Sequence, residues 1–474
     1  DIKADMYSRN TVYVALDNHK YGDFKPYLLK STDAGRTWTN MTANLPENLL
    51  VWRIVQDHVD KDLFFLATEF GIYFTVNGGA YWSKLKGGVP TISFRDLAIQ
   101  KRENDLVGAS FGRSFYVLDD YSFLREVSEE QMQADATLFA PRKAWWYIPR
   151  PKLSFYGNGS QGADHYVADN PPFGAVFTYH LGEGPKTMAA ERKKAEKDLN
   201  KDNKDVPFPG WDALATEMQQ DGPKVMIAIS DASGQVIRRI KGKASQGFHR
   251  INWDLRYPGY NTVRVGERSG WAGRGLMAPP GTYTATLYRM MDGEVEQLGQ
   301  PQKLQVERLY DGALKGANTD QVVSFWRELE NTQAAVSAAS FSLRKAKNRT
   351  KAMKTALSRA NAAPGGLDTR LHAVHQQLVD IDMAMNGNPA KAELGEKDFP
   401  TIGERLGYAF TATERSSYGP TVTARRNVDI AKEEFKKLRD ELTVLIEVTM
   451  PALEREIREA GAPWIEGQPL PKVD

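Results

Sequence analysis

The 474-residue sequence contains no cysteine, which excludes disulfide bonds, thiolate metal sites, iron–sulfur clusters and cysteine nucleophiles. It also lacks an excess of charge of one sign. Its 62 basic and 60 acidic side chains leave a net charge of +2, so no global field favours nucleic acid or a membrane surface. No apolar run approaches the roughly 18–20 residues that cross a bilayer, and we expect no transmembrane segment. The length exceeds what one hydrophobic core holds and predicts about three domains.

Catalytic and metal-binding patterns are also missing. The seven histidines form no H-E-x-x-H or similar spacing, and His372 and His375 have no acidic ligand pattern beside them. A glycosidase needs two carboxylates across a sugar site, and the candidates at strand ends are Asp17, Glu69, Asp119 and Asp120. The sequence shows neither an arginine cluster nor a nucleophilic tyrosine beside these carboxylates. We therefore predict no catalytic residue, no metal site and no cofactor in this chain.

What the sequence does contain is a repeat near its start. The segment Ser31-Thr32-Asp33-Ala34-Gly35-Arg36-Thr37-Trp38 recurs in weaker form as Thr75-Val76-Asn77-Gly78-Gly79-Ala80-Tyr81-Trp82. The step from position 33 to position 77 is 44 residues, about the length of one four-stranded propeller blade. The structural residues of this motif are Ser31, Asp33, Gly35, Thr37 and Trp38 in the first copy, and Asn77, Gly79 and Trp82 in the second.

A turn-fastening role explains these residue types. The short carboxylate of Asp33 can accept hydrogen bonds from N–H groups of its own turn. Gly35 supplies a positive φ, and Trp38 is expected to insert between the sheets of adjacent blades. The alternative interpretation is a carboxylate that binds sugar or metal.

The first copy matches the pattern S-x-D-x-G-x-T-W, the Asp box, and the chain resembles bacterial sortilin-like Asp-box (BNR-repeat) β-propeller proteins, often labelled glycosyl hydrolases. The segments 12–19, 23–27 and 115–120 are similar to the final blades of that family, in the same order. The resemblance implies a C-terminal portion of a bacterial protein that is extracellular, periplasmic or outer-membrane-associated. About 120 residues at ~44 per blade make fewer than three blades, so we expect further N-terminal blades in a separate chain or a missing portion.

The fold class expected is mainly β followed by α. Residues 1–132 are expected to form terminal propeller blades, and residues 133–170 an aromatic linker or strap. Period-two segments from 171 to 308 predict an Ig/Fn3-like β-sandwich, interrupted at about 186–222 by a charged insertion that is either a solvated helix or a mobile arm, with a partner site as the alternative. From 309 to 474 apolar residues recur at helical spacing, which predicts an antiparallel helical bundle.

Two further clusters are candidate binding residues. Trp145, Trp146 and Tyr147 could stack on a sugar ring, although such a run commonly packs a strap between domains. The stretch from 344 to 359 holds seven basic residues and no acid, and Arg344, Lys345 and Lys347 open it. It is either a solvated helix end or a site for an anionic partner.

Two functions follow from these observations. In the first, a binding or scaffold protein uses the propeller to hold a peptide or protein. In the second, a glycan-active hydrolase carries its catalytic carboxylates on N-terminal blades outside this chain. Because the Asp box is a folding device and a fold does not transfer chemistry, we favour the first.

Overall fold

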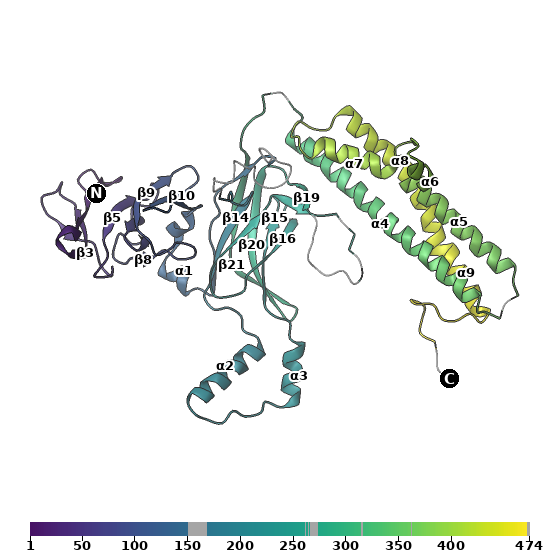
Figure 1. The fold of residues 1–474 in the computed structure, drawn as a ribbon, viewed down its shortest axis with the longest axis horizontal. Helices are drawn as coiled ribbons and strands as arrows, with labels where there is room; N and C mark the ends of the chain where they lie inside the picture. The colour runs from purple at the N-terminus through teal and green to yellow at the C-terminus, as the bar shows by residue number, and fades with distance from the viewer. Residues whose placement is uncertain are drawn as a thin grey trace. The chain divides into compact units, whose positions relative to one another are not determined.

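The computed structural model describes residues 1–149, 168–260, 262–263, 265, 274–313, 316–361 and 363–471. Most of the expected strap, residues 150–167, lies outside this description. The fold is mixed, with antiparallel sheets first and helices later (Figure 1). The chain forms two compact units. Unit 1 comprises Asp1–Trp145, Pro151–Asp254 and Gly281–Glu307, and unit 2 comprises Trp146–Arg150, Leu255–Pro280 and Arg308–Asp474.

Unit 1 begins with three successive antiparallel sheets, here called sheets 1, 2 and 3. Each has its strands in sequence order, as in a meander. Sheet 1 contains β1 (Ile2–Ala4), β2 (Val12–Asn18), β3 (Asp23–Ser31) and β4 (Thr39–Asn40). Sheet 2 contains β5 (Val51–Gln56), β6 (Phe64–Thr68), β7 (Gly71–Thr75) and β8 (Ser83–Lys84). Sheet 3 contains β9 (Phe94–Gln100), β10 (Asp105–Ser110) and β11 (Phe115–Leu118).

Sheet 2 is buried on both faces. Phe64 and Leu66 of β6 belong to one core with Tyr13 and Leu28 of sheet 1. Phe65 and Ala67, which point to the opposite face because strand side chains alternate, belong to a second core with residues of sheet 3. This explains why β6 is a continuous apolar run instead of an alternating one. Burying one such phenylalanine contributes roughly 1.5–3 kcal/mol.

The second part of unit 1 consists of short connecting elements and two further sheets. The connecting elements are η2 (Ser122–Glu126) and α1 (Glu129–Gln133), whereas η1 (His19–Tyr21) joins β2 to β3 in sheet 1. One sheet has the order β12-β14-β17 and the other β13-β21-β20-β15-β16. Their strands are β12 (Ala136–Leu138), β13 (Ala144–Trp146), β14 (Ala175–Leu181), β15 (Lys224–Ser230), β16 (Val236–Gly242), β17 (Gly247–Trp253), β20 (Gly281–Met291) and β21 (Glu294–Arg308).

These two sheets contact each other through aromatic side chains. Trp253 of β17 meets Tyr283 of β20 edge-to-face, with ring centroids 5.0 Å apart, and both rings are buried. Between β14 and β15 the charged insertion forms two helices, α2 (Met188–Lys201) and α3 (Trp211–Gln219), drawn below the strands in Figure 1. Neither helix contains a buried residue.

Unit 2 combines a two-stranded sheet with a group of helices. The strands are β18 (Arg256–Pro258) and β19 (Arg274–Met277). The helices are α4 (Thr319–Leu357), α5 (Gly366–Asn386), α6 (Pro389–Leu394), α7 (Ile402–Thr413), α8 (Val422–Val444), the π-helical turn η3 (Leu445–Thr449) and α9 (Met450–Glu459). The long helix α4 contacts α5, α7, α8 and α9 and carries buried Phe325, Trp326 and Leu329.

The π-helical turn has a local cause. Pro451 follows it at the first turn of α9. A proline has no backbone N–H to donate to the helix, and its ring clashes with the carbonyl group four residues earlier and displaces it. The helical path therefore continues from α8 into α9 by widening one turn. Such single π turns are the usual form in which π-helix occurs.

Candidate binding surfaces

The two repeat turns, residues 31–38 and 75–82, share part of their hydrogen bonding. In the first turn the backbone N–H groups of Arg36 and Thr37 donate to Oδ1 of Asp33 at 3.0 and 2.8 Å, and the Thr37 hydroxyl donates to Oδ2 at 2.7 Å. The Thr37 backbone and hydroxyl, with Ser31, lower the pKa of Asp33 to about 2. In the second turn Asn77 Oδ1 accepts from the Tyr81 N–H at 3.0 Å. An amide oxygen thus replaces the carboxylate oxygen, which fits a turn-fastening role.

The tryptophans at the ends of the two turns have different surroundings. Trp82 is 2% exposed and lies in the core between sheets 1 and 2. Its indole N–H donates to the Met41 carbonyl at 2.9 Å, and its backbone N–H donates to Asn44 Oδ1 at 2.7 Å. Trp38 is 43% exposed, and among the described residues its indole N–H has no hydrogen-bond partner. The glycines of the two turns differ in the same way, the second being crowded and the first open. A Cβ on Gly79 would lie 2.6 Å from Met41, whereas a Cβ on Gly35 would meet only Trp38, at 3.6 Å.

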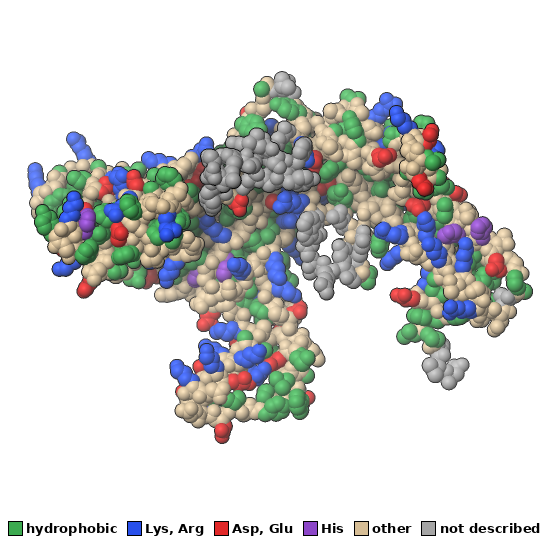
Figure 2. Space-filling view, viewed as in Figure 1, with side chains coloured by type: hydrophobic (Ala, Val, Ile, Leu, Met, Phe, Trp, Pro, Cys, Tyr) green, Lys and Arg blue, Asp and Glu red, His purple; other side chains and the backbone are tan. Residues whose placement is uncertain are grey.

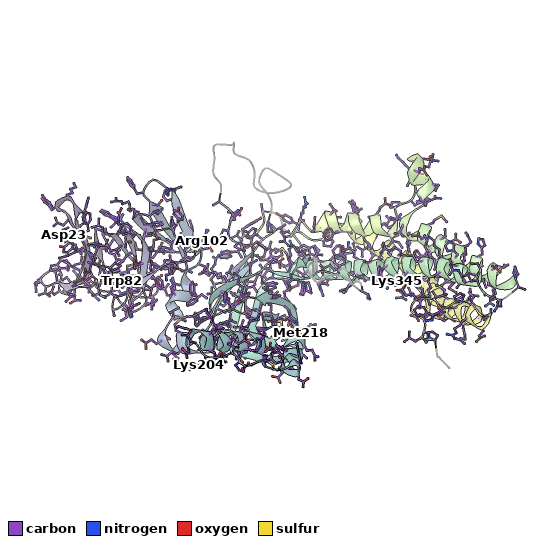
Figure 3. All side chains as sticks on the ribbon, turned by 60° about the horizontal axis from the view of Figure 1, so that its bottom comes forward. Asp23, Trp82, Arg102, Lys204, Met218 and Lys345 are labelled. Carbon is purple, nitrogen blue, oxygen red and sulfur yellow. The ribbon has the colours of Figure 1, made fainter. Side chains whose placement is uncertain are left out.

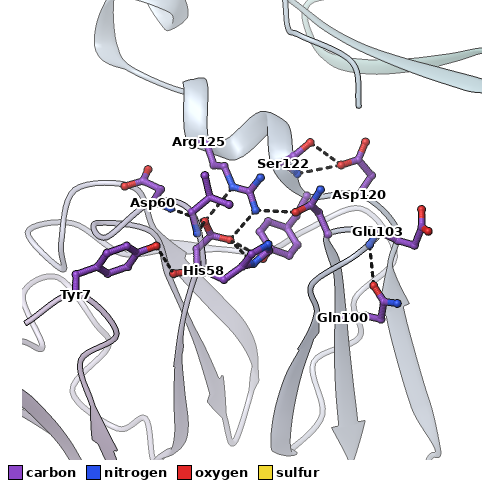
Figure 4. A network of polar contacts seen from close by, with 12 residues as sticks. Tyr7, His58, Asp60, Gln100, Glu103, Asp120, Ser122 and Arg125 are labelled. Atoms are coloured by element: carbon purple, nitrogen blue, oxygen red, sulfur yellow. Dashed lines mark hydrogen bonds and ion pairs between the residues drawn. The ribbon is translucent and has the colours of Figure 1, made fainter. Parts of the chain in front are cut away.

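A buried polar network joins the ends of sheets 2 and 3 (Figure 4). The Asp57 side chain is fully buried and accepts two hydrogen bonds from Arg125 at 2.9 Å and one from the Tyr121 hydroxyl at 2.6 Å. Burial raises the pKa of Asp57, but the bonds from Arg125, Tyr121 and the N–H groups of Asp60 and Val59 outweigh it and lower the pKa to about 2. Because both oxygens are occupied by protein groups, we assign this carboxylate to the fold and not to a ligand.

A cleft of about 450 Å³ opens at the other end of β5. We call it the Trp52–Arg95 cleft, and the residues that line it come from sheets 1, 2 and 3: His19, Phe24, Asn48, Leu50, Trp52, Glu69, Phe70 and Arg95. Glu69 Oε2 accepts from Trp52 Nε1 and from the Ser93 hydroxyl, both at 2.9 Å, and lies 3.6 Å from an Arg95 nitrogen. The Arg95 guanidinium lies 3.8 Å from the centre of a Trp52 ring.

Of the residues that line the cleft, only Glu69 was identified from the sequence as a candidate functional residue. Trp52 is the second residue of β5 and Arg95 the second residue of β9. The 43-residue step between them is nearly that of the repeat, and this was the signal that could have found them.

The other candidate carboxylates do not line the cleft. Asp17 pairs with His19 on an exposed surface. Asp119 and Asp120 lie beyond β11, where Arg250 donates to both of their carbonyl oxygens. Burial and the nearby Asp105 carboxylate raise the pKa of Asp119. Among the described residues that line the Trp52–Arg95 cleft, Glu69 is therefore the one carboxylate, and no pair of carboxylates spans it.

The aromatic candidates occupy different environments. The Trp145 indole N–H donates to Glu103 Oε1 at 3.1 Å. Trp146 is 3% exposed, donates to the Ala278 carbonyl at 2.9 Å and stacks on Trp326 with ring centroids 6.5 Å apart. Tyr147 lines a cavity of about 370 Å³ with Trp146, Arg308 and Tyr418, among others. Its low exposure and its contacts with Ala278 and Trp326 make Trp146 a packing residue.

The basic candidates lie on α4. Arg344 and Lys345 are exposed, and their cationic groups lie 5.6 and 4.9 Å from the Phe341 ring. Lys347 instead pairs with Asp382 of α5. Figure 2 shows lysine, arginine and histidine side chains gathered on this helical face. The alternative of an anionic-partner site stays a prediction.

The part of the chain that the structure describes contains no group of three His, Asp or Glu side chains able to hold a metal ion. Within those same residues, no helix combines the length and apolar character needed to cross a bilayer.

The sequence matches no protein-family model and no curated protein. Several solved structures match over part of their length. The extracellular domain of a one-component system from B. thetaiotaomicron is 9% identical, over 63% of this chain and 30% of that chain, with a TM-score of 0.18. An ancestral GH74 enzyme is 14% identical, over 66% and 39%, with a TM-score of 0.21. The BSP domain of a biofilm-associated protein is 6% identical, over 56% and 30%, with a TM-score of 0.14. This chain thus spans well under half of each, and at these TM-scores the likeness does not show a shared fold.

Proposed function

We propose that this chain belongs to a binding or scaffold protein of the bacterial cell exterior or envelope, in which sheets 1–3 are terminal blades of an Asp-box β-propeller. The propeller would hold a peptide or protein partner, and sheet 1 would pack on a preceding blade. The single observation that carries the proposal is the difference between Trp82 and Trp38.

Trp82 shows what the tryptophan of a repeat turn does when a sheet precedes it. The preceding sheet supplies a carbonyl at Met41, an amide at Asn44 and an apolar surface. Trp38 occupies the same place in its own turn and has none of these contacts among the described residues. A preceding sheet with the same groups would bury its ring and pair its N–H, and buried tryptophans generally do have such a partner.

The outer faces of the stack support the same assignment. On the free face of sheet 1, Ile2 lies opposite Val14 and Leu16 opposite Tyr27, and Ile2 and Leu16 are exposed. Exposed apolar side chains on adjoining strands mark surfaces that other structures cover. On sheet 3, β11 turns Phe115 outward at 71% exposure, with Val117 beside it. Both end sheets thus present an apolar face of the kind that sheet 2 buries.

Hydroxyl-radical oxidation of the protein isolated from its natural source, read by mass spectrometry, tests the proposal. Trp38 should be protected as strongly as Trp82, because both would lie between sheets. In this chain alone Trp38 should oxidise readily. Trp211, which is 78% exposed on α3, is the matched control and should react in both samples. Equal reactivity of Trp38 in the two samples would overturn the assignment of sheet 1 as an inner blade.

A further inference from the structure

The cavity of about 370 Å³ in unit 2 lies where three segments meet: the end of β13, the end of β21 with the residues after it, and the loop between α7 and α8. We call it the Arg308 pocket, and its polar lining includes Arg308, Tyr310, Arg415, Ser416, Ser417 and Tyr418. We propose that this pocket binds a small molecule through an anionic oxygen group, a carboxylate, phosphate or sulfate. It would be a second binding site, beyond the proposed function, because its lining belongs to unit 2 and not to sheets 1–3.

The charge of the Arg308 pocket has one sign. Among the described residues that line it, the charged side chains are Arg308 and Arg415, and there is no Asp or Glu. Arg415 pairs with Glu414 at 3.2 Å, and its side chain is 62% exposed. Arg308 is half-buried, and no carboxylate in the described part of the chain forms an ion pair with it. Because a partly buried cation attracts an anion more strongly than a fully solvated one does, the pocket favours an anionic ligand.

Arg308 keeps most of its hydrogen-bonding capacity for a ligand. Its guanidinium lies 5.9 Å from the centre of a Trp146 ring, and its one printed hydrogen bond runs from Nη1 to the Thr319 hydroxyl at 3.5 Å. A guanidinium has five N–H donors in a planar fork. Two parallel donors of that fork match two oxygens of a carboxylate, phosphate or sulfate group. Arg308 is therefore the residue that we expect to hold the anionic group.

Hydroxyl groups line another part of the pocket. Ser416, Ser417, Tyr310 and Tyr418 each contribute one. The Ser416 hydroxyl oxygen accepts from the Tyr418 N–H at 3.3 Å, which leaves the hydroxyl proton of Ser416 to donate. A hydroxyl can both donate and accept, so these groups suit the anionic oxygens and the remainder of a ligand alike. The two guanidiniums cannot accept a hydrogen bond, and they set the anionic class.

The wall of the pocket is held in place by the chain itself. The Ala317 N–H donates to the Tyr418 carbonyl at 2.9 Å. The Tyr418 ring lies against two glycines, since a Cβ on Gly312 would lie 2.5 Å from its hydroxyl oxygen and a Cβ on Gly316 would lie 2.9 Å from the ring. A wall that is already ordered loses less entropy when a ligand binds. The volume also falls within the range of about 300–1,000 Å³ that is typical of small-molecule sites.

Isothermal titration calorimetry of the full chain, at constant ionic strength set with potassium chloride, tests the proposal. The probes are inorganic phosphate, sulfate, acetate and glucuronate, and glucose is the neutral match of glucuronate. We expect at least one of the four anions to bind at one site, with glucose giving no binding. The anions that bind show whether the group is a carboxylate, a phosphate or a sulfate.

For the anion that binds, Arg308→Gln should lower the affinity at least about tenfold, as for a central contact residue. Arg455→Gln removes an exposed arginine of α9 that does not line the pocket and should bind normally. Arg415→Gln changes an exposed side chain, so it should keep the melting temperature and weaken binding by a smaller factor. It decides the question if Arg308→Gln does not fold.

Three results would overturn the proposal: no binding of any of the four anions, equal binding of glucose and glucuronate, or unchanged affinity in a folded Arg308→Gln. If Arg308→Gln does not fold, unchanged affinity in Arg415→Gln overturns it. The oxidation experiment on Trp38 reports on a surface of unit 1, so either result can fail without the other.

Discussion

In each repeat turn one side chain accepts a hydrogen bond from the backbone N–H four residues later, a carboxylate at Asp33 and an amide at Asn77. Asp33→Ala removes the acceptor of the Arg36 and Thr37 N–H groups and should lower the melting temperature by a few degrees. Asp33→Asn should restore most of it, because Asn77 already does this work in the second turn. Circular dichroism melting of the three chains measures this. If Asp33→Ala melted normally yet lost ligand binding, the carboxylate would be a binding group.

Asp57 differs because its charge is buried. Asp57→Ala leaves Arg125 without its carboxylate partner and should destabilise unit 1 by about 3–5 kcal/mol. Since the folded pKa, about 2, lies below the ordinary 3.8, the charge contributes stability above about pH 4 and loses it as pH falls toward about 2. Urea unfolding across that range should show a slope that Asp57→Asn reduces. An unchanged slope in Asp57→Asn would contradict this assignment.

At the scale of elements, the arm formed by α2 and α3 is held by few contacts. Arg192 pairs with Glu217 through two hydrogen bonds of 2.8 and 2.9 Å, and Gln220 and Asp221 bond to Asp292. Figure 3 shows Lys204 and Met218 on this arm, and Met218 is exposed. Replacing residues 186–221 by a short glycine linker should leave the melting temperature of the rest unchanged, because little core is removed. Insoluble expression of that variant would show that the arm packs on a surface.

Strands were predicted best where a short run is rich in β-branched and aromatic residues. Alternation indicates a strand at 175–181, and the structure has β14 there. The 15-residue β21 was not foreseen, because its Glu- and Gln-rich, mostly exposed sequence has no apolar alternation and it forms by pairing with β20. The helix α9 was not predicted, because a proline such as Pro451 commonly marks the end of a helix. In the structure the π turn lets the helix continue past this proline.

Less of the candidate site than of the fold could be predicted from the sequence. Glu69 was recognised as a carboxylate at a strand end, but its partners Trp52 and Ser93 are 17 and 24 residues away along the chain. The pairing of β5 with β6 brings Trp52 beside Glu69, and the packing of sheet 3 on sheet 2 adds Ser93. A repeat predicts that equivalent strand positions lie side by side, yet which of those positions face a cleft depends on packing between sheets.

On the scale of the whole molecule, the two units carry buried carboxylates of opposite pH behaviour. Asp57 in unit 1 has a lowered pKa. Glu330 in unit 2 is 2% exposed, and burial raises its pKa despite hydrogen bonds from the Leu276 N–H and, at 3.1 Å, from Arg327. A carboxyl whose folded pKa is raised contributes stability below its ordinary value of 4.5 and loses it as pH rises through the folded pKa. The charged form of Glu330 therefore costs unit 2 stability at neutral pH.

Separate unfolding of the units follows from their separate cores, and calorimetry should resolve two transitions. Glu330→Gln keeps an oxygen for the Leu276 N–H but removes the buried charge. It should therefore raise the transition of unit 2 at neutral pH, with little effect below about pH 4.5, where the native carboxyl is already protonated. Asp57→Ala should lower only the transition of unit 1. Each variant thus serves as the control for the other, because each carboxylate lies in a different unit. A single transition displaced by both substitutions would show that the units unfold as one cooperative body.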